Sequence, residues 1–230
     1  MEGSLKAIYI GKSMRKQLVI FDLDGTLLNT IADIAMATNH ALSVLGYPTH
    51  SEEVVKSFVG NGVGKLLERA LPEDKRTEEN VSLLRQHFTE FYDKHNADLS
   101  TPYPGISEML LSLQKAGIMV AVASNKYQFA TEKLVAHYFP GINFISVLGQ
   151  RPGIPVKPSP EIVLEIMAKA NVCKETALYV GDSGVDMQTA CNAGINVIGV
   201  SWGFRPRAEL EAYSPLAIVE DASELVQFVL

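Results

Sequence analysis

The chain has 230 residues and a formal net charge of −6, from 20 lysines and arginines against 26 aspartates and glutamates. This balance supplies no basic surface of the kind that nucleic acid or an anionic membrane requires, so we expect neither as a partner. Hydrophobic residues make up 47% of the chain and charged residues 20%, which is typical of a globular protein with a sizeable core. No apolar run approaches the ~20 residues that a membrane-spanning helix needs.

The cysteines and the first residues bear on the cellular location. Cys173 and Cys191 lie in different segments without metal-ligand spacing, so we expect buried, structural thiols in a reducing compartment rather than a disulfide or a zinc site. Residues 1–16 lack a long apolar core and a small-residue cleavage site, which makes them a poor signal peptide. We interpret them as an N-terminal extension, with Met14 as an alternative start, and expect a cytoplasmic protein.

The first strong pattern is a strand that ends in two carboxylates. Residues 18–21 are apolar and rich in β-branched and aromatic side chains, and Asp22, Asp24 and Gly25 follow directly. Two carboxylates so close together would repel each other. The arrangement therefore calls for a cation or for a shared proton.

The stretch from Asn29 to Leu99 reads as helical, because apolar residues recur at the three- and four-residue spacing of a buried helix face. Glycines interrupt the pattern at residues 60–64, which form either a plain hinge between helices or a loop that meets a substrate. No strand is expected in this stretch. The expected helices cover residues 30–44, 51–58, 65–71 and 78–94.

Beyond Tyr103, short apolar strands alternate with helices. This alternation predicts an α/β fold with a parallel sheet covered on both faces, in which the helical stretch is an insertion after the first strand. The expected strands cover residues 118–123, 144–148, 177–181, 197–200 and 216–219. The expected helices cover residues 106–116, 129–137, 160–170 and 187–192, with a closing helix from Ser223.

Polar side chains follow several of these strands. In an open α/β sheet the ligand crevice lies beyond the carboxyl ends of the strands, so we expect the polar side chains to converge there. Taken alone, each piece could be a helix cap, a turn or an exposed loop charge, but their order, each after an apolar strand, favours a site. The candidate residues are Asp22, Asp24, Ser124, Asn125, Lys157, Asp182 and Asp186.

This set of residue types suits phosphoryl transfer. Clustered carboxylates recruit a hard divalent cation, most plausibly Mg²⁺, because no His or Cys cluster offers ligands to a softer metal. A lysine, a serine hydroxyl and an asparagine amide are donors suited to phosphate oxygens. A carboxylate nucleophile beside a second carboxylic acid could attack phosphorus and protonate the leaving oxygen, through an aspartyl phosphate.

The motifs resemble those of the haloacid dehalogenase superfamily. Its phosphatases carry Asp-x-Asp-Gly-Thr, then Ser or Thr, then Lys, then a Gly-Asp-Ser motif with a further Asp, and here these stand at residues 22–26, 124, 157 and 181–186. The resemblance implies a Rossmann-like, doubly wound core of residues 17–28 and 103–230. It also implies an α-helical cap domain inserted at residues 29–102.

The resemblance also implies a role for each residue. Asp22 would be the nucleophile and Asp24 the general acid and then base. Asp22, the backbone carbonyl of Asp24 and Asp182 would hold Mg²⁺, with Asp186 in support. Ser124, the backbone near Asn125, and Lys157 would bind the transferring phosphoryl group.

Within the superfamily, residues 60–71 and 202–207 are similar to segments of phosphoglycolate phosphatases, although we interpret residues 202–207 as a loop that lines the core rather than as a substrate contact. We therefore expect a monomeric or homodimeric phosphatase of a small phosphorylated metabolite. A sugar phosphomutase or an inorganic pyrophosphatase of the same superfamily is the alternative, and a non-catalytic phosphate-binding module is a more remote one. Mutases typically carry a histidine where this chain has Ile34.

Overall fold

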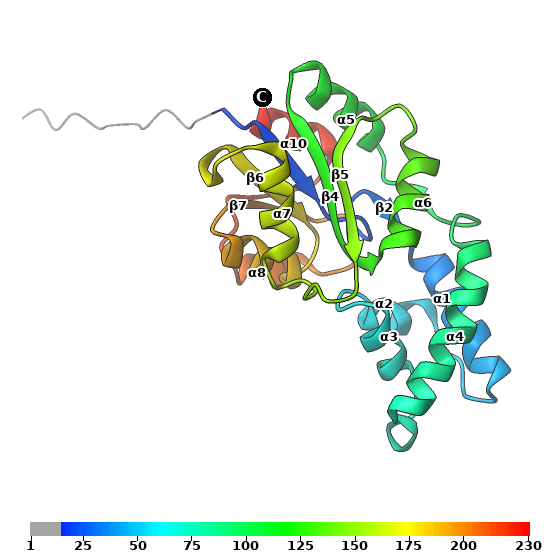
Figure 1. Ribbon diagram of the computed structural model, residues 1–230. Helices are drawn as coiled ribbons and strands as arrows, with labels where there is room; N and C mark the ends of the chain where they lie inside the picture. The colour runs from blue at the N-terminus through cyan, green and yellow to red at the C-terminus, as the bar shows by residue number, and fades with distance from the viewer. Residues whose placement is uncertain (1–14) are drawn as a thin grey trace, which may run out of the picture.

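The computed structural model describes residues 15–230, and a parallel sheet of six strands forms its centre (Figure 1). The strands are Leu18–Phe21 (β1), Met119–Tyr127 (β4), Phe144–Gln150 (β5), Ala177–Gly181 (β6), Asn196–Val200 (β7) and Ala217–Val219 (β8). They lie in the order β5-β4-β1-β6-β7-β8, and all neighbours run parallel. The predicted α/β class with a Rossmann-like, doubly wound sheet is therefore confirmed.

Strand β1 lies in the middle of the sheet and has no exposed side chain. It pairs with β4 on one side, where Leu18 lies opposite Met119, and with β6 on the other, where Leu18 lies opposite Ala177. A strand covered on both edges and both faces needs apolar side chains throughout, which explains the uninterrupted run Leu-Val-Ile-Phe. The chain emerges from this strand directly at Asp22.

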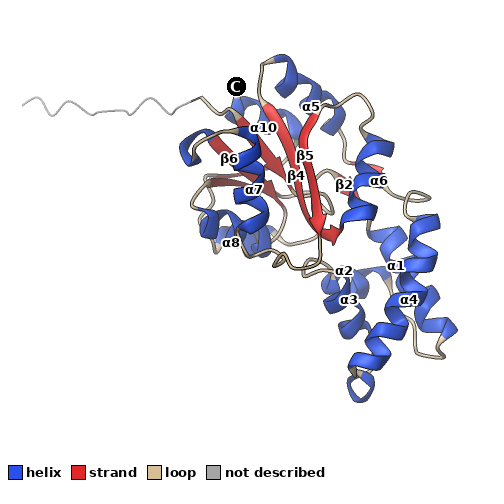
Figure 2. Ribbon diagram, viewed as in Figure 1, coloured by secondary structure: helices blue, strands red, loops and turns tan. Residues whose placement is uncertain are grey.

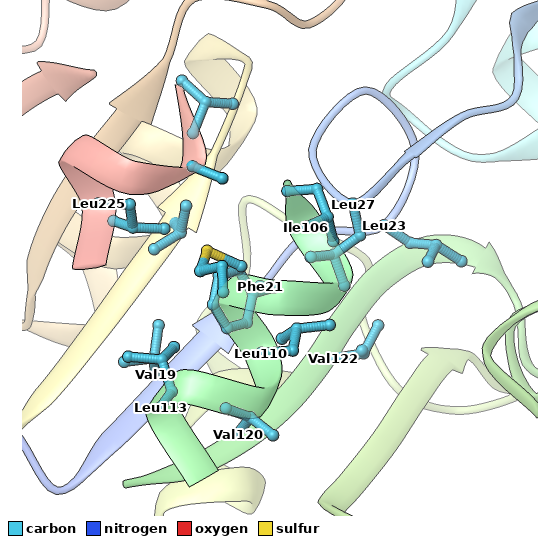
Figure 3. Packing of buried hydrophobic residues seen from close by; sticks show 14 of the residues in the cluster. Val19, Phe21, Leu23, Leu27, Ile106, Leu110, Leu113, Val120, Val122 and Leu225 are labelled. Carbon is cyan, nitrogen blue, oxygen red and sulfur yellow. The ribbon is translucent and has the colours of Figure 1, made fainter. Parts of the chain in front are cut away.

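Helices cover both faces of the sheet (Figure 2). One face packs against Ile106–Lys115 (α5), Gln128–Tyr138 (α6) and Ala222–Val229 (α10), and the other against Glu161–Ala170 (α7) and Gly184–Ala193 (α8). Because side chains alternate along a strand, Val19 and Phe21 reach the first layer, where they pack against Leu110 and Leu113 (Figure 3). A short helix, Arg207–Glu211 (α9), follows β7.

Four further helices form a separate cluster with a hydrophobic core of its own. They are Ile31–Val44 (α1), Glu52–Phe58 (α2), Val63–Ala70 (α3) and Glu78–His95 (α4). Ser51 and Thr77 cap α2 and α4 by accepting hydrogen bonds from backbone N–H groups three residues on. The cluster lies beyond the end of the sheet toward which β4 and β5 point (Figures 1 and 2). The domain boundaries given above stay a prediction.

Two short strands that were not predicted lie at the two ends of the helical stretch, and the first overlaps it only at Asn29. Leu28–Asn29 (β2) and Thr101–Pro102 (β3) pair antiparallel and form a two-stranded link between the sheet and the helical cluster. Two residues are too few to show the alternation of apolar and polar side chains that predicts a strand. The two strands pair because the helices between them bring the chain back to the sheet. The predicted helix after residue 64 also begins earlier, at Val63.

Three further elements differ from the prediction near the carboxyl ends of the strands. β4 continues to Tyr127 rather than ending at residue 123, although the added residues are mostly polar. α8 begins at Gly184 rather than at 187, because Ser183 and Asp186 form a capping box. α9 was not predicted at all, since five residues are too few to show a helical period.

The two cysteines lie on the surface of the protein. Both thiols are free, but Cys173 and Cys191 are exposed, so the predicted burial is wrong. Cys191 lies on the outer side of α8, between the buried Ala190 and Ala193. The predicted N-terminal extension falls outside the described residues except for Arg15 and Lys16. Within residues 15–230, no helix combines the length and apolar character needed to cross a membrane.

Asp33 of α1 holds the chain segment that leads from α4 back to β3. This α1 side chain is fully buried, and its carboxylate accepts hydrogen bonds from the Leu99 N–H (3.0 Å), the Ser100 N–H (2.8 Å) and the Ser100 hydroxyl (2.6 Å). A buried carboxylate with this many donors substitutes for water around its charge. Asp33 therefore fixes where the chain leaves the helical cluster.

We predict that Asp33→Ala lowers the free energy of unfolding by about 2–4 kcal/mol, because the buried N–H and hydroxyl of Ser100 and the half-buried N–H of Leu99 lose their acceptor. Urea denaturation measures the loss. Asp98→Ala is the control, since that carboxylate is 51% exposed and pairs only with His95 at the surface, where a pair contributes about 0–1 kcal/mol. Equal effects of the two substitutions would contradict the anchoring role.

Candidate active site

The structure brings all seven predicted site residues to the carboxyl edge of the sheet. One pocket there is lined by Asp22 and Asp24 after β1, Ser124 and Asn125 in β4, and Asp182 after β6. Lys157 and Asp186 lie behind it in contact with each other and with this group. The convergence follows from the parallel sheet, which places the ends of β1, β4 and β6 side by side.

Three of the carboxylates form one tight group. Asp22, Asp182 and Asp186 are buried, and each offers an oxygen atom within 4.8 Å of the other two. Asp24 stands apart, because its Oδ1 accepts a hydrogen bond from the Thr30 hydroxyl (2.6 Å) and lies 3.2 Å from the Lys126 ammonium. The two aspartates of the first motif thus face different partners.

Burial and crowding raise the pKa of two carboxyl groups of this cluster, Asp22 and Asp182. Burial, reinforced by the negative charge of Asp186, raises the pKa of Asp22 well above its usual range. The same two causes raise the pKa of Asp182 to about 7. Binding of a divalent cation would remove this repulsion and release the protons, so the group fits a cation site.

Lys157 is the internal counter-charge of the group. Its side chain is 2% exposed, and the ammonium contacts Asp22 Oδ1 at 2.9 Å, Asp186 Oδ1 at 2.7 Å and the Tyr179 hydroxyl at 2.9 Å. Burial alone lowers the pKa of Lys157, but the charges of Asp186 and Asp22 outweigh it and raise the pKa well above its usual range. The side chain is therefore a permanent cation beside Asp22.

Asp186 is held from several directions. Its Oδ2 accepts hydrogen bonds from the Ser183 N–H (3.1 Å) and the Ser183 hydroxyl (2.6 Å), while Oδ1 faces Lys157 and Tyr179. This carboxylate therefore closes the capping box of α8 and orients Lys157 at the same time. Both oxygen atoms of Asp186 therefore already have partners among the neighbouring side chains.

Asp182 is held by two loops that approach it closely. Its Oδ1 accepts from the Thr26 hydroxyl at 3.1 Å, and its Oδ2 accepts from the Phe204 N–H at 2.7 Å. Gly25 and Gly203 leave room for this carboxylate, since an added Cβ would lie 2.4 Å and 2.2 Å from its atoms. A larger residue at either position would displace Asp182.

The loop of residues 202–207 lines the core, as interpreted, and also reaches the pocket. Trp202 packs against the core of the sheet and donates to the Thr26 carbonyl, and Phe204 belongs to the core of the helical cluster. Phe204 and Arg205 in addition line the pocket. The Arg205 guanidinium donates to the backbone carbonyls of Lys56, Ser57 and Val59 at the end of α2. The loop thus contacts both Asp182 and the helical cluster.

Asn125 makes a second connection to that cluster. Its side-chain amide donates to the Gly60 carbonyl (2.8 Å) and to the Lys157 carbonyl (3.0 Å), and its Oδ1 accepts from the Lys157 N–H (2.8 Å). These bonds position Lys157 and bring the glycine-rich segment around Gly62 to the pocket wall. Ser124 lies beside it, 2% exposed, and accepts a hydrogen bond from the Lys126 N–H.

Lys126, Tyr92 and Tyr179 also belong to the site and were not among the predicted residues. Lys126 directly follows the Ser124-Asn125 motif and could have been found from its position in β4. Tyr179 lies inside an apolar strand and Tyr92 on a helix far away in sequence, so neither carries a local signal. Both are buried and contact a site lysine through their hydroxyls.

Comparison with known proteins identifies the family. Residues 19–200 match the haloacid dehalogenase-like hydrolases. The chain belongs to this family. This haloacid dehalogenase-like hydrolase is 36% identical over 221 residues to the phosphoglycolate phosphatase of Vibrio parahaemolyticus. The match covers 93% of this chain and 96% of that protein. It is 33% identical over 224 residues to the phosphoglycolate phosphatase of Vibrio cholerae, covering 93% and 97%.

A solved structure supports the same assignment. The crystal structure of a protein from Lactobacillus delbrueckii subsp. bulgaricus matches with a TM-score of 0.88 at 32% identity and covers 94% of this chain and 99% of that one. This member of the haloacid dehalogenase-like hydrolases is therefore a phosphoric monoester hydrolase, similar to phosphoglycolate phosphatases. Enzymes of the family generally use a divalent metal, and the three buried carboxylates can bind one.

We predict that Lys157→Met destabilises the protein by about 3 kcal/mol at pH 8, because Asp22 and Asp186 lose their buried counter-charge. Without Lys157 the pKa of Asp22 rises further, and a carboxyl whose folded pKa exceeds its unfolded value stabilises the fold at low pH and loses that contribution as pH rises. The loss should therefore be smaller at pH 5.5 than at pH 8. Urea denaturation at both pH values, with the exposed Lys169→Met as control, measures it, and a pH-independent loss would contradict the pairing.

Proposed function

We propose that the chain is a Mg²⁺-dependent phosphatase that hydrolyses a small phosphorylated metabolite, with 2-phosphoglycolate as the first candidate, through an aspartyl phosphate on Asp22. One observation carries the proposal: Asp22 lies beside the Lys157 cation and inside the buried carboxylate group, while the Asp24 carboxylate reaches the same pocket through other partners. The two carboxylates are thus set up for different roles. The names of the bacterial relatives suggest the substrate.

In the first step a carboxylate oxygen of Asp22 attacks phosphorus and the bond from phosphorus to the leaving oxygen breaks. Asp24 gives its proton to that oxygen, so the product leaves as an alcohol. In the second step water attacks the phosphorus of the aspartyl phosphate and gives a proton to Asp24. The bond from phosphorus to Asp22 breaks, which releases phosphate and restores the Asp22 carboxylate and the protonated Asp24.

The remaining residues bind and orient. Ser124 and Lys157, with the backbone near Asn125, would hold the oxygens of the transferring group, for which Lys157 exchanges one of its present contacts. Asp22, the Asp24 carbonyl and Asp182 would hold Mg²⁺, with Asp186 supporting from behind. Bound Mg²⁺ supplies positive charge, which reduces repulsion between the carboxylates and an anionic substrate.

We also propose that residues 29–102 act as a cap that closes over this pocket. The support is that Asn125 and Arg205 of the core hold backbone carbonyls of residues 56–60 at the pocket wall. A closed cap would exclude water during the first transfer and release the product on opening. If Arg205→Ala left substrate preference in the panel described below unchanged, this clasp would have no part in selection.

The direct test is phosphate release from 2-phosphoglycolate, pyrophosphate and glucose 1-phosphate, with Mg²⁺ or with EDTA. We expect 2-phosphoglycolate to be the best substrate, EDTA to stop release, and Asp22→Asn to lower kcat at least about 10⁴-fold while the protein stays folded by circular dichroism. Asp98→Asn is the matched surface control.

Other outcomes would redirect the assignment. Fast release from pyrophosphate would favour a pyrophosphatase, and conversion of glucose 1-phosphate to glucose 6-phosphate a mutase. Stoichiometric binding of every substrate without release would leave a phosphate-binding module. Release that survives both EDTA and Asp22→Asn would contradict the proposed mechanism.

A further inference from the structure

Lys126 places a buried cation beside Asp24. The residue is next to last in β4, and its side chain is only 6% exposed. Its ammonium lies 3.2 Å from Asp24 Oδ1 and donates a hydrogen bond of 2.8 Å to the Tyr92 hydroxyl of α4. It also lies 4.7 Å from the centre of the Tyr92 ring, so three groups fix its position.

The wall of the pocket around Lys126 is otherwise short of positive charge. Apolar and aromatic side chains from α1, α3 and α4 line that side, among them Ile34, Leu66 and Phe88. Arg205 is the other cation among the described lining residues, but its guanidinium is engaged by three backbone carbonyls. An ammonium has three donors, and the Lys126 ammonium has two neighbouring acceptors, so it can take one more anionic partner.

The short distance between Lys126 and Asp24 limits how far apart the two ligand atoms that they contact can lie. If Asp24 contacts the leaving oxygen, a ligand atom bound by Lys126 lies close to that oxygen, because the two protein groups are 3.2 Å apart. In a 2-hydroxy acid the hydroxyl oxygen and the nearer carboxylate oxygen are separated by roughly 3 Å, as bond lengths of about 1.4–1.5 Å require. Each additional carbon between them widens that separation. The charge of Lys126 and its short distance from Asp24 therefore favour a short leaving group with an anion next to the ester carbon.

We propose that Lys126 binds the carboxylate of the leaving acid and so selects esters that carry phosphate on the carbon next to a carboxylate. The proposal rests on the proposed phosphatase function and assigns a residue to recognition of the part of the substrate that is not transferred. Tyr92 positions the ammonium from the helical cluster, so the specificity contact is complete only when α4 lies over the end of β4. Asp24 and Lys126 together then contact two oxygen atoms of one substrate, the leaving oxygen and the nearer carboxylate oxygen.

The experiment compares three esters: 2-phosphoglycolate, ethyl phosphate, which has the same two carbons without the carboxylate, and 3-phosphoglycerate, whose carboxylate is one carbon farther away. The readout is the ratio of kcat/KM for 2-phosphoglycolate to that for each of the others. We expect Lys126→Met to lower the ratio to ethyl phosphate by about 10²-fold, because a desolvated charge pair is lost. Lys126→Arg should keep part of the ratio, and the exposed Lys169→Met should keep all of it.

The ratio separates recognition from other effects of the substitution. A change in Asp24 or in folding lowers kcat/KM for all three esters and cancels in the ratio. If the ratio stays at its wild-type value in Lys126→Met, or if wild-type enzyme does not prefer 2-phosphoglycolate to ethyl phosphate, the assignment of Lys126 is overturned while the phosphatase function stands. No release from any ester by wild-type enzyme would instead refute the proposed function.

A binding measurement tests the role of Lys126 without turnover. On the Asp22→Asn background, calorimetry with 2-phosphoglycolate should give a Kd about 10²-fold weaker when Lys126→Met is added. Ethyl phosphate should bind the two proteins alike. Equal weakening for both ligands would show that Lys126 does not contact the carboxylate.

Discussion

The structure depends on the burial of three carboxylates in one small volume at the end of β1. Asp22, Asp182 and Asp186 would repel one another without compensation, and burial together with that repulsion raises the pKa of Asp22 and Asp182. Lys157 offsets part of the charge, and hydrogen bonds from Ser183, Thr26 and the Phe204 N–H offset more. What remains is a shortage of positive charge for full ionisation of the three carboxyl groups, which a divalent cation would supply.

Residues beside the three buried carboxylates also connect the sheet to the helical cluster. The loop that supplies the Phe204 N–H to Asp182 continues into Arg205, which holds the end of α2. The β4 residues next to Ser124 do likewise: Asn125 holds Gly60, and Lys126 reaches Tyr92 of α4. Residues that stabilise the carboxylates or border them therefore also contact the helical cluster.

The sequence predicts the sheet and the residues at its edge because both carry local signals. Apolar runs such as Leu18–Phe21 are strands that are buried on both faces, and a parallel sheet brings their polar ends together. Seven candidate residues could be named for this reason. Their convergence follows from topology, whereas their individual roles rest on the proposed mechanism.

What could not be predicted depends on contacts between distant segments. β2 and β3 have two residues each and pair only after 71 intervening residues have folded. Asp33 looks like an ordinary residue of an amphipathic helix until Leu99 and Ser100 are seen to donate to it. Tyr92 and Tyr179 resemble core residues because most of each ring is apolar, and only the position of the hydroxyl marks them as part of the site.

The central claim is that Asp22 becomes covalently phosphorylated, and reductive trapping tests it most directly. Wild-type enzyme is mixed with Mg²⁺ and p-nitrophenyl phosphate, whose leaving group needs no proton, and is quenched within one turnover with borodeuteride. An aspartyl phosphate is reduced to deuterated homoserine, and peptide mass spectrometry locates it. The account predicts homoserine at position 22 alone, whereas label at another carboxylate, or steady phosphate release with none at position 22, would contradict it.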